Sequence, residues 1–527
     1  MLNTTMDPEK AILEKTNIAE LPPTYIDVAE GDILAPKDIS TTYWGVLGKW
    51  SRKLESLGVE ARGIQPVLPE ERTPQSYWGL CMIWTSAGLT IGTLTTGILG
   101  PYSFNLTFNQ TCAIIWGAGG LGSAVSAYLA IFGKKNGMRA LVNARYIMGY
   151  YGAMIIAMLN NLTNIVFGVL DCILGGQTLN ALSKGRLPTI AGMVIVGIVP
   201  WFLGTAGFKY IHYYERVAWI GPAIVFISLY AVGTPHFETS MTPPVSPDSS
   251  PIDSATQTGL ILSYIAVIYG SFSGWVAISA DYYIYFPVTT PSWKIFLMSF
   301  LGMFVMPAFA MTCGAGFATA LWMNDAWAEN WEENGSVAAL VEIVLRPLGP
   351  VRYFFIFIFA WSLISNNVFN YYSISIATQI FGSRALLLPR YVYTLLACII
   401  MIIMSILGRS SLYTILSDLM AIIGYWCTIY FVIFVEEHLI FRSWMGRGWD
   451  LEAWNERKRL PTGLAAMGAF CVGIVGAVLG MSEAWYTGVA GRLVGSYGGD
   501  LGSELGFLFA GAAYLMMRWV ELKYFDR

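Results

Sequence analysis

Charged residues are scarce in this chain. Asp, Glu, Lys and Arg make up 12% of its 527 residues, about half the share found in ordinary soluble proteins. So few charged side chains cannot cover the surface of a soluble protein of this length. The net charge of −3, with no basic stripe among aromatic residues, also argues against nucleic acid as a partner.

Motifs for metal binding and catalysis are missing as well. The seven cysteines are scattered without a CxxC pair, and the three histidines form no HExxH motif. No P-loop or GxSxG motif occurs. A GxGxxG string at Gly117, Gly119 and Gly122 lies inside an apolar run with no strand before it, so we interpret it as a helix-packing face. We predict that the chain is not an enzyme and needs no metal or cofactor.

Long apolar runs are abundant instead. Hydrophobic residues make up 55% of the sequence, and runs of the roughly 20 residues that cross a bilayer recur after residue 76. We therefore predict an all-α membrane protein with about twelve transmembrane helices. The predicted spans lie near residues 77–99, 112–132, 146–174, 188–206, 216–233, 258–286, 293–322, 351–381, 391–408, 411–435, 463–481 and 503–520.

Loop charges predict the orientation of the chain. Segments 234–257 and 323–350 are acidic, whereas the loops after the second and tenth spans are basic. Basic loops stay in the cytosol, so we predict a multi-pass protein of the cell membrane with a cytosolic tail (1–76), loop (436–462) and C-terminus (521–527). The basic residues are Lys134, Lys135, Arg139, Arg145, Arg442, Arg447, Arg457, Lys458 and Arg459.

The Pro- and Ser-rich segment 234–257 divides the spans into two sets of five, 77–233 and 258–435. We interpret this segment as an extracellular linker. Because five is an odd number, the second set enters the membrane from the opposite side, as in an inverted repeat. Residues 463–520 then contribute two further helices.

The first and sixth spans, which correspond in such a repeat, are both interrupted by small and hydroxyl residues. The interruptions are Thr85–Gly88 and Gly270–Gly274. Glycine is unfavourable inside helices, so both segments can unwind at mid-depth. Paired interruptions point to the binding site of a transporter. The alternative is close helix packing by small residues.

Polar residues of the third and eighth spans are candidate ligands. Phe167 and Asp171 are four residues apart, as are Asn366 and Asn370, so each pair shares a helix face. An amide offers a donor and an acceptor to the edge of a heterocycle, although asparagines also hold membrane helices together. A carboxylate inside the membrane, such as Asp171, marks a cation, proton or substrate path unless it lies at an exposed helix end.

Trp275 follows Gly274 at the interruption of the sixth span. Its indole can stack on a flat substrate and offer a donor, whereas most of the 19 tryptophans are expected in the lipid belt or the core. Asp281 and Asp418 are weaker candidates, because they lie nearer the ends of their spans, where water reaches a carboxylate.

Two motifs connect the chain to known proteins. The first is Glu60–Val67 followed by Glu70–Thr73, and the second is Gly424–Trp426 followed by Glu436–His438, Phe441 and Arg442. They resemble motifs of the fungal purine-cytosine permease branch of the nucleobase-cation-symport-1 family, and the resemblance extends from about residue 45 onward. It implies a LeuT-like fold of two inverted five-helix repeats, with two added C-terminal helices and a substrate at mid-membrane between the first, third, sixth, eighth and tenth spans.

The resemblance also implies site residues. It places the first-span serine of the family near Ser86, its sixth-span tryptophan on Trp275, and its eighth-span asparagines on Asn366, Asn367 and Asn370. Several positions differ from the family pattern, among them Ala87 and Gly88 in the first span, near which the family has an asparagine. Phe167 and Asp171 stand where the third span usually has a tryptophan and an asparagine, and Phe369 replaces a proline.

Together these observations predict a proton-coupled importer of purine bases, cytosine or a related flat nitrogen heterocycle, with the lipid bilayer and that small molecule as its partners. We expect Asp171 to favour a substrate with N–H donors or a positive ring nitrogen, such as cytosine or a protonated B6 vitamer. A second hypothesis makes Asp171 part of proton coupling. A receptor that binds such a molecule without moving it is the alternative of a different class.

Overall fold

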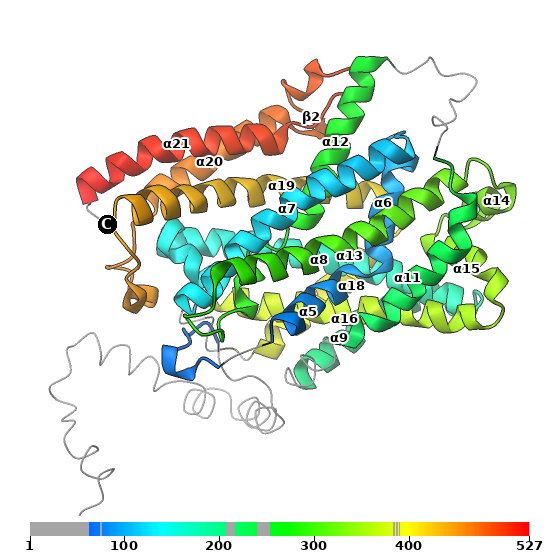
Figure 1. Cartoon of the computed structure of the whole chain (residues 1–527), viewed down its shortest axis with the longest axis horizontal. Helices are drawn as coiled ribbons and strands as arrows, with labels where there is room; N and C mark the ends of the chain where they lie inside the picture. Colours follow the sequence, from blue (N-terminus) through cyan, green and yellow to red (C-terminus); the bar gives the residue numbers. More distant parts are fainter. Residues whose placement is uncertain are drawn as a thin grey trace, which may run out of the picture. The chain divides into compact units, whose positions relative to one another are not determined.

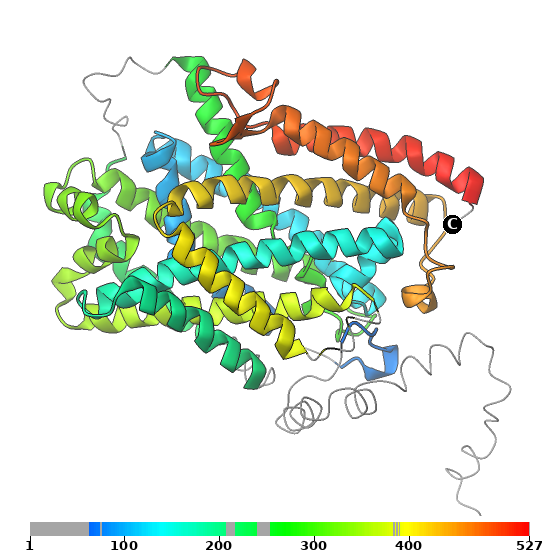
Figure 2. The ribbon, with the colours of Figure 1, turned by 180° about the vertical axis from the view of Figure 1, so that it is seen from behind.

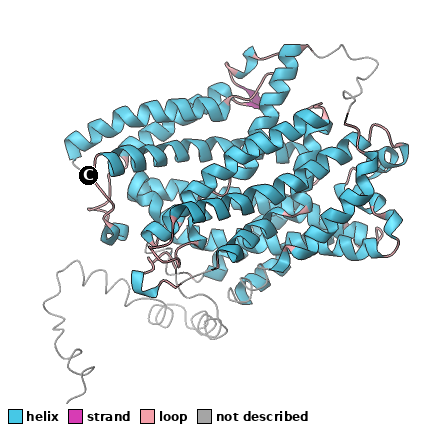
Figure 3. Cartoon of the chain, viewed as in Figure 1, coloured by secondary structure: helices cyan, strands magenta, loops and turns pink. Residues whose placement is uncertain are grey.

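Helices form most of the computed structural model, which describes residues 63–73, 76–206, 217–239, 253–382, 385, 388 and 390–525. Figure 3 shows a helical chain with one small strand pair. The predicted tail and the predicted linker fall largely outside the described residues.

The first half of the chain contains six described α-helices. A 3₁₀ turn, η2 (Pro69–Glu71), precedes them, and η3 (Thr234–His236) follows them. The helices are α5 (Tyr77–Gly88), α6 (Ile91–Ser103), α7 (Phe108–Asn136), α8 (Ala140–Leu182), α9 (Thr189–Ala206) and α11 (Ile220–Gly233).

The second half continues in the same way and ends with a helix pair (Figure 1). Its long helices are α12 (Ser254–Ser273), α13 (Ser292–Ala320), α16 (Val351–Gln379), α18 (Arg390–Gly408), α19 (Leu412–Glu436), α20 (Leu464–Gly480) and α21 (Gly502–Phe525). The shorter elements are η4 (Ser279–Tyr282), α14 (Asp325–Asn334), α15 (Val337–Val344), η5 (Arg346–Leu348), the π-helix η6 (Glu437–Trp444), η7 (Leu451–Asn455), β1 (Ser482–Glu483), β2 (Tyr486–Thr487) and η8 (Gly491–Leu493).

Most of the described helices are suited to a membrane. Eight are long and apolar enough to cross one, and the bent pair α5 and α6 makes a ninth. Three shorter apolar helices, at residues 189–203, 220–236 and 464–480, lie at the positions of further predicted spans. The total of twelve spans stays a prediction.

The long helices form two groups. In the first, α13 packs against α5, α6 and α7, and α12 packs against α7. In the second, α8, α9, α16 and α18 pack against one another. We call these groups the bundle and the scaffold. Each takes helices from both halves of the chain, and α20 and α21 lie side by side next to α19 (Figure 2).

Both predicted interruptions are real breaks. The axes of α5 and α6 differ by 56°, and the hydroxyl of Thr90 caps the start of α6 by accepting from Thr93 N at 3.3 Å. In the sixth span α12 ends at Ser273, within the predicted interruption at Gly270–Gly274, and the chain continues through turns into η4.

Small residues also serve the alternative role of close packing. A Cβ at Gly88 would collide with the ring of Pro307, and one at Gly270 with the backbone of Met420. In the GxGxxG string, a Cβ at Gly119 would lie 2.7 Å from the ring of Phe272 on α12. The interpretation of that string as a packing face is confirmed at this position.

Two segments expected to be loops are helical. Residues 323–350 contain α14 and α15, and α15 buries Val337, Leu340, Val341 and Val344. At eight residues α15 is too short to cross a bilayer, which is why its apolar run was not predicted as a helix. The predicted loop at 436–462 begins as the π-helix η6, which continues α19.

Candidate functional site

Asp171 of α8 lies between two asparagines of α16. The side-chain amides of Asn366 and Asn370 both donate to Asp171 Oδ2, at 3.0 and 3.2 Å. Asp171 and Asn370 are 5% and 4% exposed, whereas Asn366 is half-buried. The spacing of four residues therefore brings these groups together as expected. The alternative of an exposed position near a helix end is wrong for Asp171.

Asn367 faces a different neighbour. Its amide donates to the Val196 carbonyl of α9 at 3.3 Å, and its own oxygen accepts from Asn370 at 3.2 Å. It is fully buried. In this arrangement Asn367 fixes the orientation of the Asn370 amide, and through it the polar cluster is attached to α9.

Two aromatic rings face each other next to this cluster. Phe167 lies one helical turn from Asp171 on α8, and its ring is nearly parallel to that of Trp275, with centroids 6.3 Å apart and planes inclined by 11°. Both side chains are half-buried. Trp275 reaches this position because α12 ends at Ser273. The break of the sixth span therefore places the Trp275 ring of the bundle opposite the Phe167 ring of the scaffold.

The first span contributes Ser86 and a residue that the sequence did not single out. Ser86 is 8% exposed. Trp84, on the same helix α5, contacts the Trp275 ring edge-on at 5.5 Å and the Tyr282 ring at 4.9 Å. Its indole N–H donates to the Tyr283 hydroxyl at 3.0 Å. The position of Trp84 just before the interruption is the one feature of the sequence that pointed to it.

Other polar residues of α8 hold helices together. Asn160 and Asn164 both donate to the Ser373 hydroxyl of α16 at 3.1 Å, and Asn161 donates to Thr378 at 3.2 Å. These contacts join α8 to α16 without a charged group. These bonds fit the helix-packing role, although the side-chain oxygens of Asn160 and Asn161 are also buried without a partner among the described residues.

The two weaker carboxylate candidates lie in different contacts. Asp281 accepts from Ala140 N at 2.7 Å, at the start of α8, and lies 3.9 Å from Arg139. Asp418 is half-buried and contacts Ser417 at 3.3 Å. Asp281 therefore stabilises a helix start.

The polar cluster is rich in hydrogen-bond acceptors. Among the described residues, the side chains that donate to the Asp171 carboxylate are amides, and no Lys or Arg pairs with it. Asn366 Oδ1 is buried and has no hydrogen-bond partner within the described part of the chain. A flat molecule with N–H donors on its edge would satisfy these acceptors.

Comparisons with known proteins agree on one family. Residues 66–499 match the family described as permease for cytosine/purines, uracil, thiamine, allantoin. The chain is 31% identical to a purine-cytosine permease of Emericella nidulans over 96% of this chain and 98% of that one. It is 27% identical to a vitamin B6 transporter of Saccharomyces cerevisiae, over 90% of each chain.

One solved structure shows the fold. Mhp1, a nucleobase-cation-symport-1 family transporter in a closed conformation with bromovinylhydantoin bound, superimposes with a TM-score of 0.65 at 13% identity, covering 88% of this chain and 95% of that one. The predicted fold class, with two inverted five-helix repeats, is confirmed.

Proposed function

Because the chain belongs to the family of permeases for cytosine/purines, uracil, thiamine and allantoin, we propose that it imports purine bases or cytosine together with a proton. The chain is a multi-pass membrane permease and not an enzyme. In alternating access, the bundle and the scaffold move relative to each other around a fixed site between them.

The observation that carries this proposal is the juxtaposition of two nearly parallel rings with the Asp171 carboxylate and with Asn366 Oδ1, an acceptor that has no partner among the described residues. A flat ring held between two others needs a contact of about 3.5 Å on each face, or about 7 Å in all. The ring centroids of Phe167 and Trp275 are 6.3 Å apart, and the gap between the ring planes is no larger than this, so the two rings must move apart before a heterocycle fits between them. Asn366 Oδ1 and Asp171 then accept N–H bonds from its edge.

We propose Asp171 as the residue that couples substrate to protons. An ionised carboxylate that contacts only amides is unstable away from water. A proton, or a positive charge on the substrate, neutralises it. Binding of both ligands together then favours the closed state that precedes release to the other side.

Orientation and location extend the proposal. The α7–α8 connection and the segment after η6 lie at the same end of the chain, because Arg145 donates to Asn455 at 2.9 Å and Tyr146 to the Asp450 carbonyl at 2.9 Å. Both segments are basic. We assign this end to the cytosol, with both termini cytosolic and the protein in the plasma membrane.

Competition uptake tests the proposal. Cells that lack their own permeases and express this chain would be given radiolabelled cytosine against adenine, hypoxanthine, uracil, allantoin and pyridoxine, with and without a protonophore. We expect cytosine uptake that purines inhibit and a protonophore abolishes. Absence of any nucleobase uptake, despite protein at the cell surface, would refute the proposal.

A cationic heterocycle such as a B6 vitamer is a second candidate. Two observations favour it: a buried carboxylate, Asp171, lies in the site without a Lys or Arg partner among the described residues, and a vitamin B6 transporter is among the relatives. The same assay separates the candidates. Uptake of labelled pyridoxine that cytosine does not inhibit would favour the second, and inhibition of cytosine uptake by purines alone would favour the first.

A further inference from the structure

A line of aromatic rings leads from the candidate site toward the end assigned to the cytosol. Trp275 contacts Trp84, Trp84 contacts Tyr282 at 4.9 Å, and Tyr282 faces two rings of α16. Those rings are Phe369 at 6.1 Å and Tyr372 at 6.5 Å. The line thus begins in the bundle and ends in the scaffold.

The loosest contacts in this line lie between the two helix groups. Within the bundle the ring centroids are 4.9 to 5.5 Å apart, but from Tyr282 across to α16 they are 6.1 to 6.5 Å apart. Tyr282 and Tyr372 are also half-buried although they face each other. Movement of the bundle away from the scaffold would therefore separate these two rings first.

Arg139 lies beside the contact between Tyr282 and Tyr372 and interacts with residues on both sides of it. Its guanidinium donates to the Tyr372 hydroxyl at 2.9 Å and to the Gly63 carbonyl at 2.8 Å, and lies 3.9 Å from the carboxylate of Asp281, the neighbour of Tyr282. The Arg139 side chain is 1% exposed. Arg139 precedes α8 of the scaffold, so this cation connects α8, α16 and the segment before α5 with η4 on the bundle side.

The adjacent tyrosine gives a useful contrast. Tyr283 is 1% exposed, and its hydroxyl contacts Trp84 at 3.0 Å and Ser299 at 2.5 Å. All three residues belong to the bundle. Tyr283 therefore stabilises the bundle internally, whereas Tyr282 faces outward from it toward the scaffold.

We propose that Tyr282 and Tyr372 form the inner gate of the substrate site and that Arg139 latches this gate, an inference that rests on the proposed function and orientation. A substrate stacked on Trp275 acts on Tyr282 through Trp84. When the contact between Arg139 and Asp281, which joins the scaffold to the bundle side, is lost, the rings part and the site opens to the cytosol.

The hydroxyl of Tyr372 gives the sharpest test. Tyr372→Phe keeps the ring and removes the hydrogen bond that holds the Arg139 guanidinium in position beside Asp281. A hydrogen bond to a charged group shifts an equilibrium by roughly tenfold. We therefore expect efflux of labelled cytosine from preloaded cells to rise about tenfold relative to uptake, with a higher KM for uptake because fewer molecules face outward.

A matched control lies on the same helix. Tyr353, at the other end of α16, accepts from Arg352 at 2.9 Å. Tyr353→Phe should leave the ratio of efflux to uptake at its original value. Tyr282→Ala should raise this ratio, and Tyr282→Phe should restore it, because the ring makes the contacts. An unchanged ratio in both Tyr372→Phe and Tyr282→Ala would overturn the gate.

A second measurement does not depend on transport. In purified protein, hydrogen–deuterium exchange reports the amide of Val67, which donates to the Gly137 carbonyl at 2.8 Å beside the latch. Tyr372→Phe should speed its exchange and Tyr353→Phe should not. If the original chain moves no nucleobase, the proposed function fails, and this exchange still decides the latch: equal rates in both variants would refute it.

Discussion

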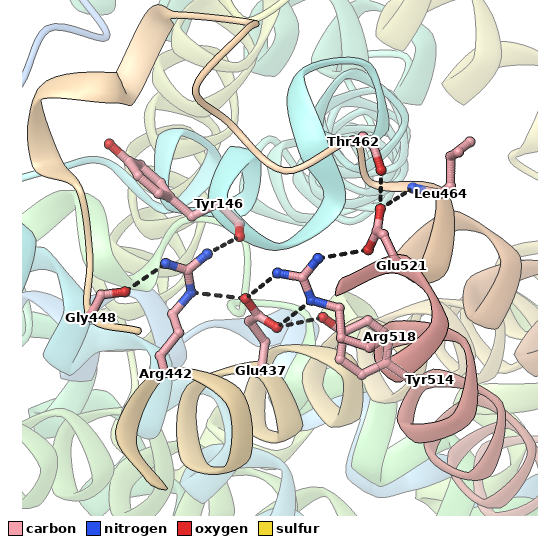
Figure 4. A network of polar contacts seen from close by, with 9 residues as sticks. All are labelled: Tyr146, Glu437, Arg442, Gly448, Thr462, Leu464, Tyr514, Arg518 and Glu521. Atoms are coloured by element: carbon pink, nitrogen blue, oxygen red, sulfur yellow. Dashed lines mark hydrogen bonds and ion pairs between the residues drawn. The ribbon is translucent and has the colours of Figure 1, made fainter. Parts of the chain in front are cut away.

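Two buried carboxylates in this protein have opposite surroundings. Glu437, at the start of η6, is 1% exposed, forms an ion pair with Arg442 at 3.0 Å, and accepts from Arg518 at 3.1 Å and from the Tyr514 hydroxyl at 2.8 Å (Figure 4). Asp171 is 5% exposed and accepts from two neutral amides. The first carboxylate is neutralised by the chain itself, and the second is not.

The positive and negative charges of the network around Glu437 balance each other. Arg518 also donates to Glu521 at 2.7 Å, and Glu521 accepts from Leu464 N at 3.1 Å and from the Thr462 hydroxyl. Two arginines therefore balance two glutamates. Their contacts join η6, α21 and the start of α20 (Figure 4).

The comparison teaches how to separate structural from functional acids in a membrane protein. A buried carboxylate with cations on every side has no charge left to offer. One that contacts only amides and adjoins half-buried rings keeps its affinity for a proton or a cation. Partner type, rather than burial, distinguishes them.

Removing a charge from the network around Glu437 should have the largest effect, a loss of stability. Glu437→Gln leaves Arg442 and Arg518 buried with one carboxylate fewer, and loss of one partner of a buried ion pair destabilises by about 3–5 kcal/mol. Thermal unfolding of the purified protein measures this. Glu452→Gln is the matched control, because its pair with Arg459 is exposed and contributes about 0–1 kcal/mol. Equal stability of both variants would contradict the comparison.

Glu483, which lies outside the membrane helices, is a third buried acid whose charge state can be tested. Burial, together with the charges of Asp500 and Asp418, raises the pKa of Glu483 in β1 to about 9. The folded chain therefore keeps a proton that the unfolded chain releases above its ordinary pKa of 4.5. Stability should fall as pH rises through this window, by up to about 1.4 kcal/mol per pH unit.

Glu483→Gln should reduce this slope, because its amide is neutral at every pH; burial also raises the pKa of Asp500, which keeps part of the slope. Thermal unfolding between about pH 6 and pH 8 measures the slope. Glu333→Gln, on the exposed surface of α14, should keep it. A slope that Glu483→Gln leaves intact would assign the proton to another group.

Neutralising Asp171 should reduce transport without reducing the stability of the fold. Asp171→Asn removes a buried charge, so the free energy of unfolding should stay constant or rise. We expect kcat/KM for uptake to fall about tenfold. If Asp171 couples protons, the pH dependence of uptake flattens; if it binds substrate, the order of competitors changes. If Asp171→Asn changes neither the pH dependence of uptake nor the order of competitors, Asp171 is not part of the substrate site.

The smallest effect should come from the helix contacts of α8. Asn160→Ala removes a bond to Ser373, and such bonds contribute about 0.6 kcal/mol in membranes. The KM for uptake should stay unchanged. Asn370→Ala, a similar truncation beside Asp171, should raise it. A higher KM in both variants would mean that the polar contacts of α8 and α16 act as one unit.

The sequence could predict elements that depend on local spacing. Phe167 with Asp171, and Asn366 with Asn370, share faces because of helical periodicity, and the glycine clusters marked both breaks. The sequence could not place Trp84 against Tyr282, since that contact depends on how distant spans pack. Glu437 and Arg442 were also missed as a pair, because five residues match the repeat of a π-helix rather than that of an α-helix.

The break after α12 also has an electrostatic consequence. A helix carries a partial negative charge of about half an electron at its C-terminal end, and α12 ends at Ser273, two residues before Trp275. The helix α5 ends at Gly88, but α6 begins at Ile91, and the positive N-terminal end of α6 offsets the negative end of α5. The dipole of α12 thus adds negative potential beside the aromatic rings. A protonated heterocycle gains from this potential, and a neutral one does so only through its own dipole.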